Sequence, residues 1–349
     1  MEENKKSGPL KTFITVSVSL AIAALFMWFA LKGMEFKKIA GYFEKANYFW
    51  VFAAALFGIL AYWFRAVRWN LLLEPMGYRI SNSNAFWTIS FGYLMNLTIP
   101  RSGEVARSTA LFGVEKVPVD KSFGTIILER VVDLVCMGGF LLLTLIFKYD
   151  AILSFYQYVT QEKSKTSEPQ SDSSLYIVLG VFLLLGILFF TLKKRLESFA
   201  LYQKVVKFAT GIFHGLMSIF RMKQKGKFIL LSLAIWVSYY LAAYLVCFAL
   251  PETSDFTFAD GFFIIVVGTL GMMVPASGGI GAFHFALKLG IMALFLSMGK
   301  DPAEGGEVGL SYAFISHTMQ LVIMIVMGII SIPMLAKARN ELVQKKKFN

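Results

Sequence analysis

The residues best suited to chemistry lie in one polar, charged break within hydrophobic sequence, between Asn96 and Arg107. Pro100 and Gly103 interrupt any helix there, so several backbone groups lose their intrahelical partners. Free amides at the start of a half-helix, with Arg101 and Arg107 beside them, would attract an anion such as a phosphate. We therefore expect a binding site that comprises Asn96, Pro100, Arg101, Ser102, Gly103, Glu104 and Arg107.

Two interpretations of this break are open. Glu104 could neutralise one of the arginines or contact a cationic head group, as part of a binding site. Alternatively, the break is an interfacial loop in which Arg101 and Arg107 simply reach lipid phosphates. Because charge inside a membrane is costly and usually serves function, the binding site is favoured.

The same pattern recurs as Pro275-x-Ser277-Gly278, so Pro-x-Ser-Gly occurs at positions 100 and 275 of a chain of 349 residues. Two breaks in corresponding positions of two halves are typical of the binding site of a transporter. Glycines here allow close backbone approach, and His284 either titrates or hydrogen-bonds a head group, or is only a packing residue. The candidate residues of this second break are Ser277, Gly278, Gly279, Gly281 and His284.

A second set of charges accompanies the breaks. Glu129, Arg130 and Asp133 lie early in an apolar segment, with both acids on one helical face. Buried in a bundle they must pair, together or with Arg101 and Arg107, either to lock the structure or to couple movement. Arg65 and Arg68 fit either anchors that extend to the membrane surface or a head-group site. We assign Arg65, Arg68, Glu129, Arg130 and Asp133 to a supporting charge network.

Other chemistry finds no support in the sequence. The two cysteines lie inside apolar runs, and the three histidines are scattered, so no metal or cofactor is expected. No nucleophile–base motif, Walker loop or dinucleotide fingerprint is visible, and a catalytic site is not predicted. The net charge of +12 fits basic loops that face anionic lipid rather than nucleic acid.

Composition and hydrophobic runs indicate what positions these residues. Hydrophobic residues make up 57% of the chain and charged residues only 16%, which excludes an ordinary soluble domain. We predict an all-α integral membrane protein with about six full spans and two re-entrant half-helix hairpins in inverted repeats. The expected spans are 12–31, 48–64, 122–147, 175–192, 228–250 and 309–335, and the half-length pieces are 85–99, 104–113, 261–274 and 280–295.

The chain is expected to form one domain over residues 1–349, with halves at about 12–147 and 175–335. Residues 148–174 would be a polar extracytoplasmic loop, and 199–220 an amphipathic surface helix. In this layout the loops on one side hold 22 Lys and Arg and those on the other side hold 8. That bias predicts cytoplasmic termini in a bacterial inner membrane, with the first break entering from the cytoplasm and the second from the opposite face.

The chain resembles the transmembrane region of the lysylphosphatidylglycerol synthase family, a flippase-like domain. The resemblance rests on Arg65-x-x-Arg68-Trp69, on Asn96-x-x-x-Pro100-Arg101-x-Gly103-Glu104-x-x-Arg107, on Glu129-Arg130-x-x-Asp133, and on the late Gly278-Gly279-Ile280-Gly281. It implies an inner-membrane protein that binds or moves a polar-headed lipid. Family members often carry Pro and Glu where Ser277 and His284 stand. The sequence has no match to the soluble aminoacyl-transferase domain of bifunctional members, so we expect no lipid aminoacylation by these residues.

The function we expect is binding and transbilayer movement of a lipid with an anionic or zwitterionic head group, which includes lipid-linked saccharides. Rocking of one half against the other would switch access. Two alternatives stay open: a non-transporting subunit that presents a lipid to a separate glycosyl- or aminoacyl-transferase, and a membrane-embedded enzyme. The expected partners are membrane lipids, with a transferase or a second copy of the chain as further candidates.

Overall fold

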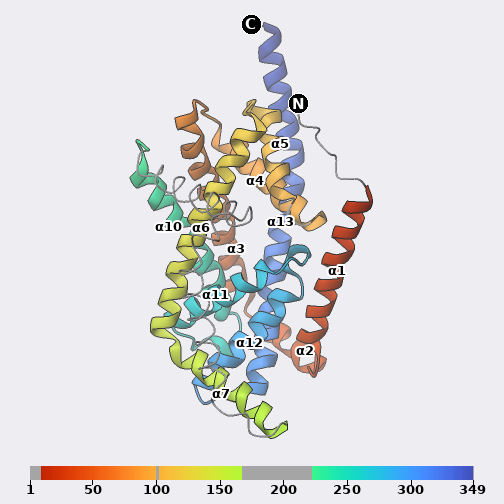
Figure 1. The fold of residues 1–349 in the computed structure, drawn as a ribbon, viewed down its shortest axis with the longest axis vertical. Coiled ribbons are helices and arrows are strands. Elements are labelled where there is room, and N and C mark those ends of the chain that lie inside the picture. Colours follow the sequence, from red (N-terminus) through yellow and green to blue (C-terminus); the bar gives the residue numbers. More distant parts are fainter. Residues whose placement is uncertain (1–8, 100–101, 167–221, 349) are drawn as a thin grey trace, which may run out of the picture.

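A computed structural model describes residues 9–99, 102–166 and 222–348, and every regular element in these ranges is helical (Figure 1). The helices form one elongated bundle. The first half contains α1 (Pro9–Leu31), α2 (Phe36–Lys45), α3 (Tyr48–Leu73), α4 (Asn82–Thr98), α5 (Gly103–Glu115), α6 (Val119–Phe147) and α7 (Tyr149–Thr166). The second half contains α10 (Lys225–Cys247), α11 (Phe258–Met273), the short η3 (Ser277–Gly279), α12 (Ala282–Ser297) and α13 (Pro302–Phe348).

Two helical hairpins occupy opposite ends of the bundle. The hairpin of α4 and α5 lies in the upper half of Figure 1, and the hairpin of α11 and α12 lies in the lower half. The contacts are reciprocal: α4 packs against α13 of the other half, and α11 packs against α6. The helices that precede the two hairpins, α3 and α10, pack against each other. Two repeats of opposite orientation would produce this matching set of contacts.

The predicted all-α membrane fold is confirmed, and the chain is an integral membrane protein, whereas the re-entrant character of the two hairpins stays a prediction. Six helical stretches of the described residues are long and apolar enough to cross a membrane: Phe13–Leu31, Tyr48–Met76, Val119–Phe147, Lys225–Cys247, Ser277–Ser297 and Pro302–Gln344. Many large apolar side chains on α1, α3, α6 and α13 are exposed, as expected where lipid replaces water.

One of these six stretches, Ser277–Ser297, was not predicted as a full span. The predicted span at 175–192 and the surface helix at 199–220 lie outside the described residues, whereas Ser277–Ser297, expected to be half-length, is long enough. This stretch is 67% buried inside the protein, the highest share of the six. It includes the η3 break, and its continuous helix, α12, has only 16 residues, fewer than the roughly 20 that a span requires.

Three other predicted bounds change. Helix α3 continues to Leu73, well past the expected end at residue 64, and α13 begins at Pro302. The segment expected to be a polar loop forms α7 as far as Thr166. Its hydrophilic composition concealed an apolar face, because Ala151 is buried and lies in the main core, with Ile152 and Phe155 packed against that core. Helix α7 packs against α12, and that contact fixes the segment as a helix.

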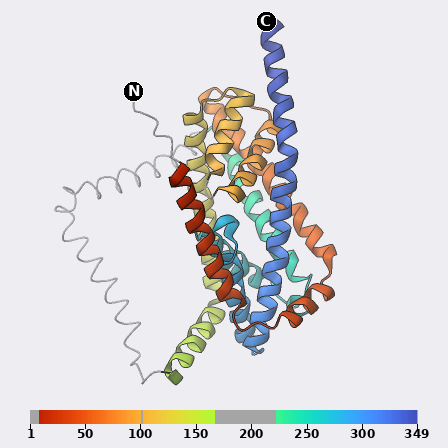
Figure 2. The same cartoon turned by 90° about the vertical axis from the view of Figure 1, so that its right-hand side faces the viewer.

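The N-terminal end of α1 and the C-terminal end of α13 both lie in the upper half of Figure 1. Helix α1 starts, and α13 stops, at the upper end of Figure 1, and α13 runs the full length of the bundle and projects beyond it (Figure 2). At the lower end, Lys38 of α2 donates a hydrogen bond to Glu307 of α13 over 3.3 Å. Lys148 and Asp260, 2.5 Å apart, join the end of α6 to the start of α11.

The first hairpin closes through two glycines. A Cβ atom added to Gly103 would lie 2.4 Å from the carbonyl oxygen of Gly92 and 2.5 Å from the Asn96 amide nitrogen. A Cβ added to Gly92 would in turn lie 2.8 Å from the carbonyl oxygen of Gly103. Backbones at this separation leave no room for a side chain, so α4 and α5 approach closely only because both residues are glycine.

This close approach predicts a stability difference between two glycines of the same helix. Gly103→Ala should destabilise the protein by about 1–3 kcal/mol, since the new methyl group displaces backbone. Gly113→Ala is the matched control, because a Cβ there meets nothing within 4 Å, and it should stabilise α5 by about 0.5–1 kcal/mol. The thermal unfolding midpoints of the purified proteins measure both effects. Equal midpoints for the two variants would contradict the close approach.

Candidate functional site

The first break is a tight, self-capped turn. Asn96 on α4 accepts a hydrogen bond from the Gly103 amide over 2.7 Å. The Ser102 hydroxyl contacts the carbonyl oxygens of Met95 and Ile99 at 2.9 and 2.8 Å, and so satisfies the C-terminal end of α4. Asn96, Ser102 and Gly103, all predicted to bind an anion, are therefore engaged in hydrogen bonds within the turn. The Gly103 amide, expected to be free for a phosphate, is not free here.

Two further residues of this motif, Pro100 and Arg101, lie outside the described residues. Their role in binding an anion stays a prediction.

Directly behind the break lies a buried cluster of charges. Arg107 on α5 contacts Glu129 on α6, with Nη1 and Oε2 separated by 2.7 Å. On α3, Arg65 and Arg68 both contact Asp133 of α6, at 2.9 and 3.0 Å. The five side chains are buried, and Glu129 and Arg68 are fully enclosed. The structure thus brings together four of the predicted network residues with Arg107 of the break.

Neutral side chains complete the cluster. Arg107 lies over the ring of Trp69, 3.5 Å from its centroid, and Trp69 donates to Thr125 over 2.8 Å. From α10, Tyr239 accepts a hydrogen bond from Arg65 and Ser232 accepts one from Arg68, both over 3.1 Å. The cluster therefore joins α3, α5 and α6 of the first half to α10 of the second.

These pairs decide how Arg65 and Arg68 are placed. The alternative in which they extend to the membrane surface is wrong, because both side chains are enclosed by protein and paired with Asp133. Because α3 continues to Leu73, Arg65 and Arg68 lie inside this helix and not just beyond its end, where the sequence had placed them. The sequence indicated neither Tyr239 nor Ser232, because nothing in an apolar segment shows which of its polar residues faces a charge.

The buried cluster carries one more positive than negative charge. Three arginines face two carboxylates, Glu129 and Asp133, so one positive charge of the cluster has no negative partner among the described residues. The Nε groups of Arg65, Arg68 and Arg107 are buried, and none of them has a hydrogen-bond partner among the described residues. Unpaired buried charge and unused donors are costly unless a ligand or water satisfies them.

The outer rim of the cluster is the pair Glu104–Arg130, at 2.9 Å and partly exposed. Both residues line a cavity of about 20 Å³ together with Gly92, Tyr93 and Arg107. A cavity of this size holds about one water molecule. A phosphate group needs more room, so a head group would reach Arg107 only after the first hairpin moves.

The second break is rich in glycine, whereas the first contains charged residues. Gly278, Gly279 and Gly281 all have positive φ, between 58° and 82°, which residues with a side chain rarely adopt. A Cβ added to Gly281 would lie 2.3 Å from the Ala23 carbonyl oxygen, so this glycine also lets α1 approach the break. Ser277 is buried beside them.

Two histidines flank this break. His284, predicted from the sequence, is buried at the start of α12, and its ring lies 4.9 Å from the ring of His317 on α13. His317 was not predicted to belong to the site, because 33 residues separate it from His284 in the sequence and only the packing of α12 on α13 joins them. In the described ranges, no group of three or more His, Cys, Asp or Glu residues could hold a metal ion.

The two breaks meet at the centre of the bundle. A Cβ built on Gly278 would lie 3.1 Å from a methyl carbon of Leu97, near the end of α4. Helix α4 and η3 are therefore neighbours, although they belong to different halves. Because α4 and η3 are in contact, a displacement of one break would alter the packing of the other.

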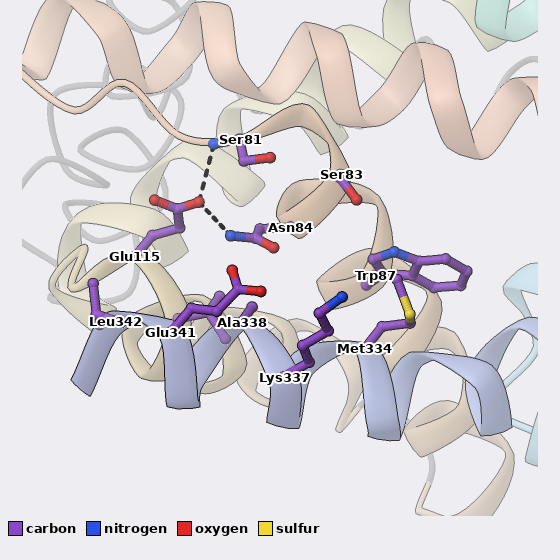
Figure 3. A pocket seen from close by; sticks show the side chains of 11 residues that line it. Ser81, Ser83, Asn84, Trp87, Glu115, Met334, Lys337, Ala338, Glu341 and Leu342 are labelled. Carbon is purple, nitrogen blue, oxygen red and sulfur yellow. Dashed lines mark hydrogen bonds between the residues drawn. The ribbon is translucent and has the colours of Figure 1, made fainter. Parts of the chain in front are cut away.

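A second pocket near the first hairpin opens at the end where α13 projects. It has a volume of about 470 Å³ and lies between the start of α4, the end of α5 and α13. Glu115 accepts hydrogen bonds there from the Ser81 amide and the Asn84 side chain, at 3.0 and 2.7 Å. Lys337 and Glu341 extend from α13 toward them (Figure 3). Charges of both signs thus line the outer end of this hairpin.

Comparison with known proteins agrees with this architecture. Residues 16–328 match the profile of the family described as the lysylphosphatidylglycerol synthase TM region. The chain is 25% identical over 269 residues to the glycosyltransferase AglD of Haloferax volcanii, a match that covers 70% of this chain and 43% of AglD. It is 28% identical over 128 residues to a UPF0104 membrane protein of Methanocaldococcus jannaschii, covering 36% of this chain and 38% of that protein.

The chain thus spans less than half the length of either relative. No solved structure shows significant similarity to it. The family profile, in contrast, covers most of the chain, including both breaks and the buried cluster. The chain therefore belongs to the lysylphosphatidylglycerol synthase TM region family.

Proposed function

We propose that this protein binds a lipid with a phosphate-bearing or saccharide-linked polar head group and moves that head group between the two leaflets. Membership in the family and the all-helical membrane fold support this proposal. The observation that carries it is the excess positive charge of the buried cluster behind the first break. An anionic group would neutralise that charge and occupy the unused guanidinium donors.

In this mechanism, the head group travels along the protein while the acyl chains stay in the bilayer. The described conformation is closed, because the cavity beside Arg107 admits about one water molecule. Displacement of the first hairpin would open that cavity toward the pocket at its outer end, where Lys337 and Glu115 lie on facing walls (Figure 3). The Arg130–Glu104 pair would then exchange its internal contact for contacts with the head group.

The orientation is part of the proposal. We place both ends of the chain in the cytoplasm of a bacterial cell, with the protein in the inner membrane. The excess of Lys and Arg in the loops of that side supports this orientation. The first hairpin would then be re-entrant from the cytoplasm, and the hairpin of α11 and α12 from the opposite face.

The charge of the cluster can be tested with two variants that break the same ion pair. Arg107→Gln removes the excess positive charge, and Glu129 keeps Arg65 nearby at 3.9 Å. Glu129→Gln raises the excess instead. In liposomes, transbilayer movement of a fluorescent phosphatidylglycerol, followed by dithionite quenching, should fall about tenfold or more in Arg107→Gln, which loses a charge-assisted contact of about 1.5–3 kcal/mol. Glu129→Gln should retain it.

The two variants control for each other, since both lose the same ion pair between Arg107 and Glu129. Arg79→Ala is a further control, because Arg79 is exposed and its ion pair is with Glu74, outside the buried cluster. Equal loss of movement in Arg107→Gln and Glu129→Gln, at matched thermal stability, would show that the cluster is structural. Fluorescent phosphatidylethanolamine, tested alongside, distinguishes an anionic from a zwitterionic preference.

A second candidate function is favoured by the name of one relative. The protein of Haloferax volcanii is a glycosyltransferase, and this chain covers less than half of it. The present chain could therefore be a membrane subunit that presents a lipid to a separate transferase, without moving it.

Crosslinking separates these two functions. A photoreactive amino acid at Lys337 or Glu341, at the mouth of the outer pocket, would capture a transferase that docks there in cells. Capture of a glycosyl- or aminoacyl-transferase, together with no lipid movement in liposomes, is the result that supports the presenting subunit. Lipid movement by the purified chain alone contradicts it. A photoreactive residue at Trp63, exposed on α3, is the control for non-specific capture.

A further inference from the structure

The second break contains two buried imidazoles supplied by different helices. His284 of α12 is 4% exposed and His317 of α13 is 1% exposed, and their ring centroids lie 4.9 Å apart. Phe283 and Phe314 pack against the pair, 5.0 Å from His317 and 4.5 Å from His284 respectively. The two imidazoles therefore lie together between aromatic side chains, beside the second break.

Each imidazole is hydrogen-bonded to the backbone of the break itself. His317 Nε2 lies 2.9 Å from the Gly278 carbonyl oxygen, which can only accept, so Nε2 carries the hydrogen. His284 Nδ1 accepts a hydrogen bond from the Gly281 amide over 3.4 Å. His317 Nδ1 is buried and has no partner among the described residues. The lone pair of His284 Nδ1 thus accepts a hydrogen bond from the break, whereas the lone pair of His317 Nδ1 is unused.

Among the described residues, neither imidazole forms an ion pair or a hydrogen bond with a charged side chain, because both hydrogen bonds go to the backbone. Lys288, one turn further along α12, donates to the carbonyl oxygens of Ala30 and Lys32. The acids of α13 nearest in sequence are Glu304 and Glu307, about three turns before His317. On α11, Asp260 is paired with Lys148, and α4 and residues 12–31 of α1 carry no charge. A buried charge without a partner is costly, so both imidazoles are neutral in this closed conformation.

We propose that the His284–His317 pair is a proton-binding site that controls the opening of the second break. A proton from water would bind Nδ1 of His284 and occupy the lone pair that now accepts the Gly281 N–H. That hydrogen bond would be lost, and two donors would face each other. A proton on His317 Nδ1 would need an acceptor that the closed conformation lacks. Protonation therefore favours a conformation in which water reaches the imidazoles.

The position of the pair extends its effect to the first break. His317 is hydrogen-bonded to Gly278, the glycine that contacts Leu97 at the end of α4. Release of Gly278 would loosen the one place where the two breaks meet. Proton uptake would thereby favour opening at both breaks. The coupling of protons to lipid movement rests on the proposed function, whereas the proton-binding site itself does not.

Two substitutions preserve the hydrogen bonds but cannot take up a proton. The amide oxygen of His284→Asn can accept the Gly281 N–H, and the amide nitrogen of His317→Gln can donate to Gly278. His214→Gln is the matched control, because it removes the only other histidine of the chain. Hydrogen–deuterium exchange of the full chain in lipid nanodiscs, read on peptides that cover residues 274–281, reports how often the break opens.

The double variant combines His284→Asn and His317→Gln. At lower pH, residues 274–281 of the wild-type protein and of His214→Gln should exchange faster than those of the double variant at the same pH. For one proton taken up on opening, the opening equilibrium rises about tenfold per pH unit below the ordinary pKa of histidine. The double variant should show no such rise. If all three proteins keep a constant ratio of exchange rates between pH 7.5 and 5, the proton-binding site is refuted.

Lipid movement in the same samples distinguishes the two proposals. Movement of fluorescent phosphatidylglycerol that depends on pH in the wild type, and is independent of pH in the double variant, supports both. Exchange that depends on pH without any lipid movement retains the proton-binding site and contradicts the proposed function. Lipid movement, together with exchange that has the same pH dependence in all variants, retains the proposed function and contradicts the proton-binding site.

Discussion

A charge placed inside a membrane must be neutralised by protein, and the buried arginine–carboxylate cluster is organised by this constraint. Hydrocarbon offers neither water nor counterions, so Arg65, Arg68 and Arg107 are stable only where Glu129 and Asp133 meet them. Those contacts fix α3, α5 and α6 relative to one another, and two polar groups of α10 extend the cluster into the second half. The position of the first hairpin follows, because α5 carries Arg107.

The two breaks divide different tasks between them. The first has fixed charge behind it, and its own backbone groups are satisfied by Asn96 and Ser102. The second has glycines with positive φ and two imidazoles whose charge can change. A permanent positive charge suits the holding of an anion, whereas a titratable group suits a change of conformation. This difference gives a physical reason why the two breaks carry different residues.

Much of this arrangement could be predicted from the sequence, because its strongest signals are local. The break at 96–107, its partner at 275–281, and the acids at 129 and 133 all lie in apolar surroundings, where polar residues stand out. What could not be predicted depends on tertiary contacts. Tyr239, Ser232 and His317 resemble ordinary polar residues of apolar helices until the packing of α10 and α13 places them. The helix α7 was hidden for a similar reason, since its apolar face is narrow and only α12 reveals it.

The contacts between the halves also restrict which movement is feasible. Helix α3 packs along α10, and α4 packs on α13 so closely that a Cβ added to Gly328 would lie 2.5 Å from the Cβ of Leu94. Rocking of one half against the other, the movement expected from the repeats alone, would separate these interfaces and pull Tyr239 and Ser232 away from the buried arginines. Where the two breaks meet, by contrast, the interface between α4 and η3 is much less extensive than either of these, and it includes the apolar side chain of Leu97 beside Gly278. Its loss costs far less than unpairing buried charge, which favours displacement of the hairpin tips within an otherwise fixed bundle.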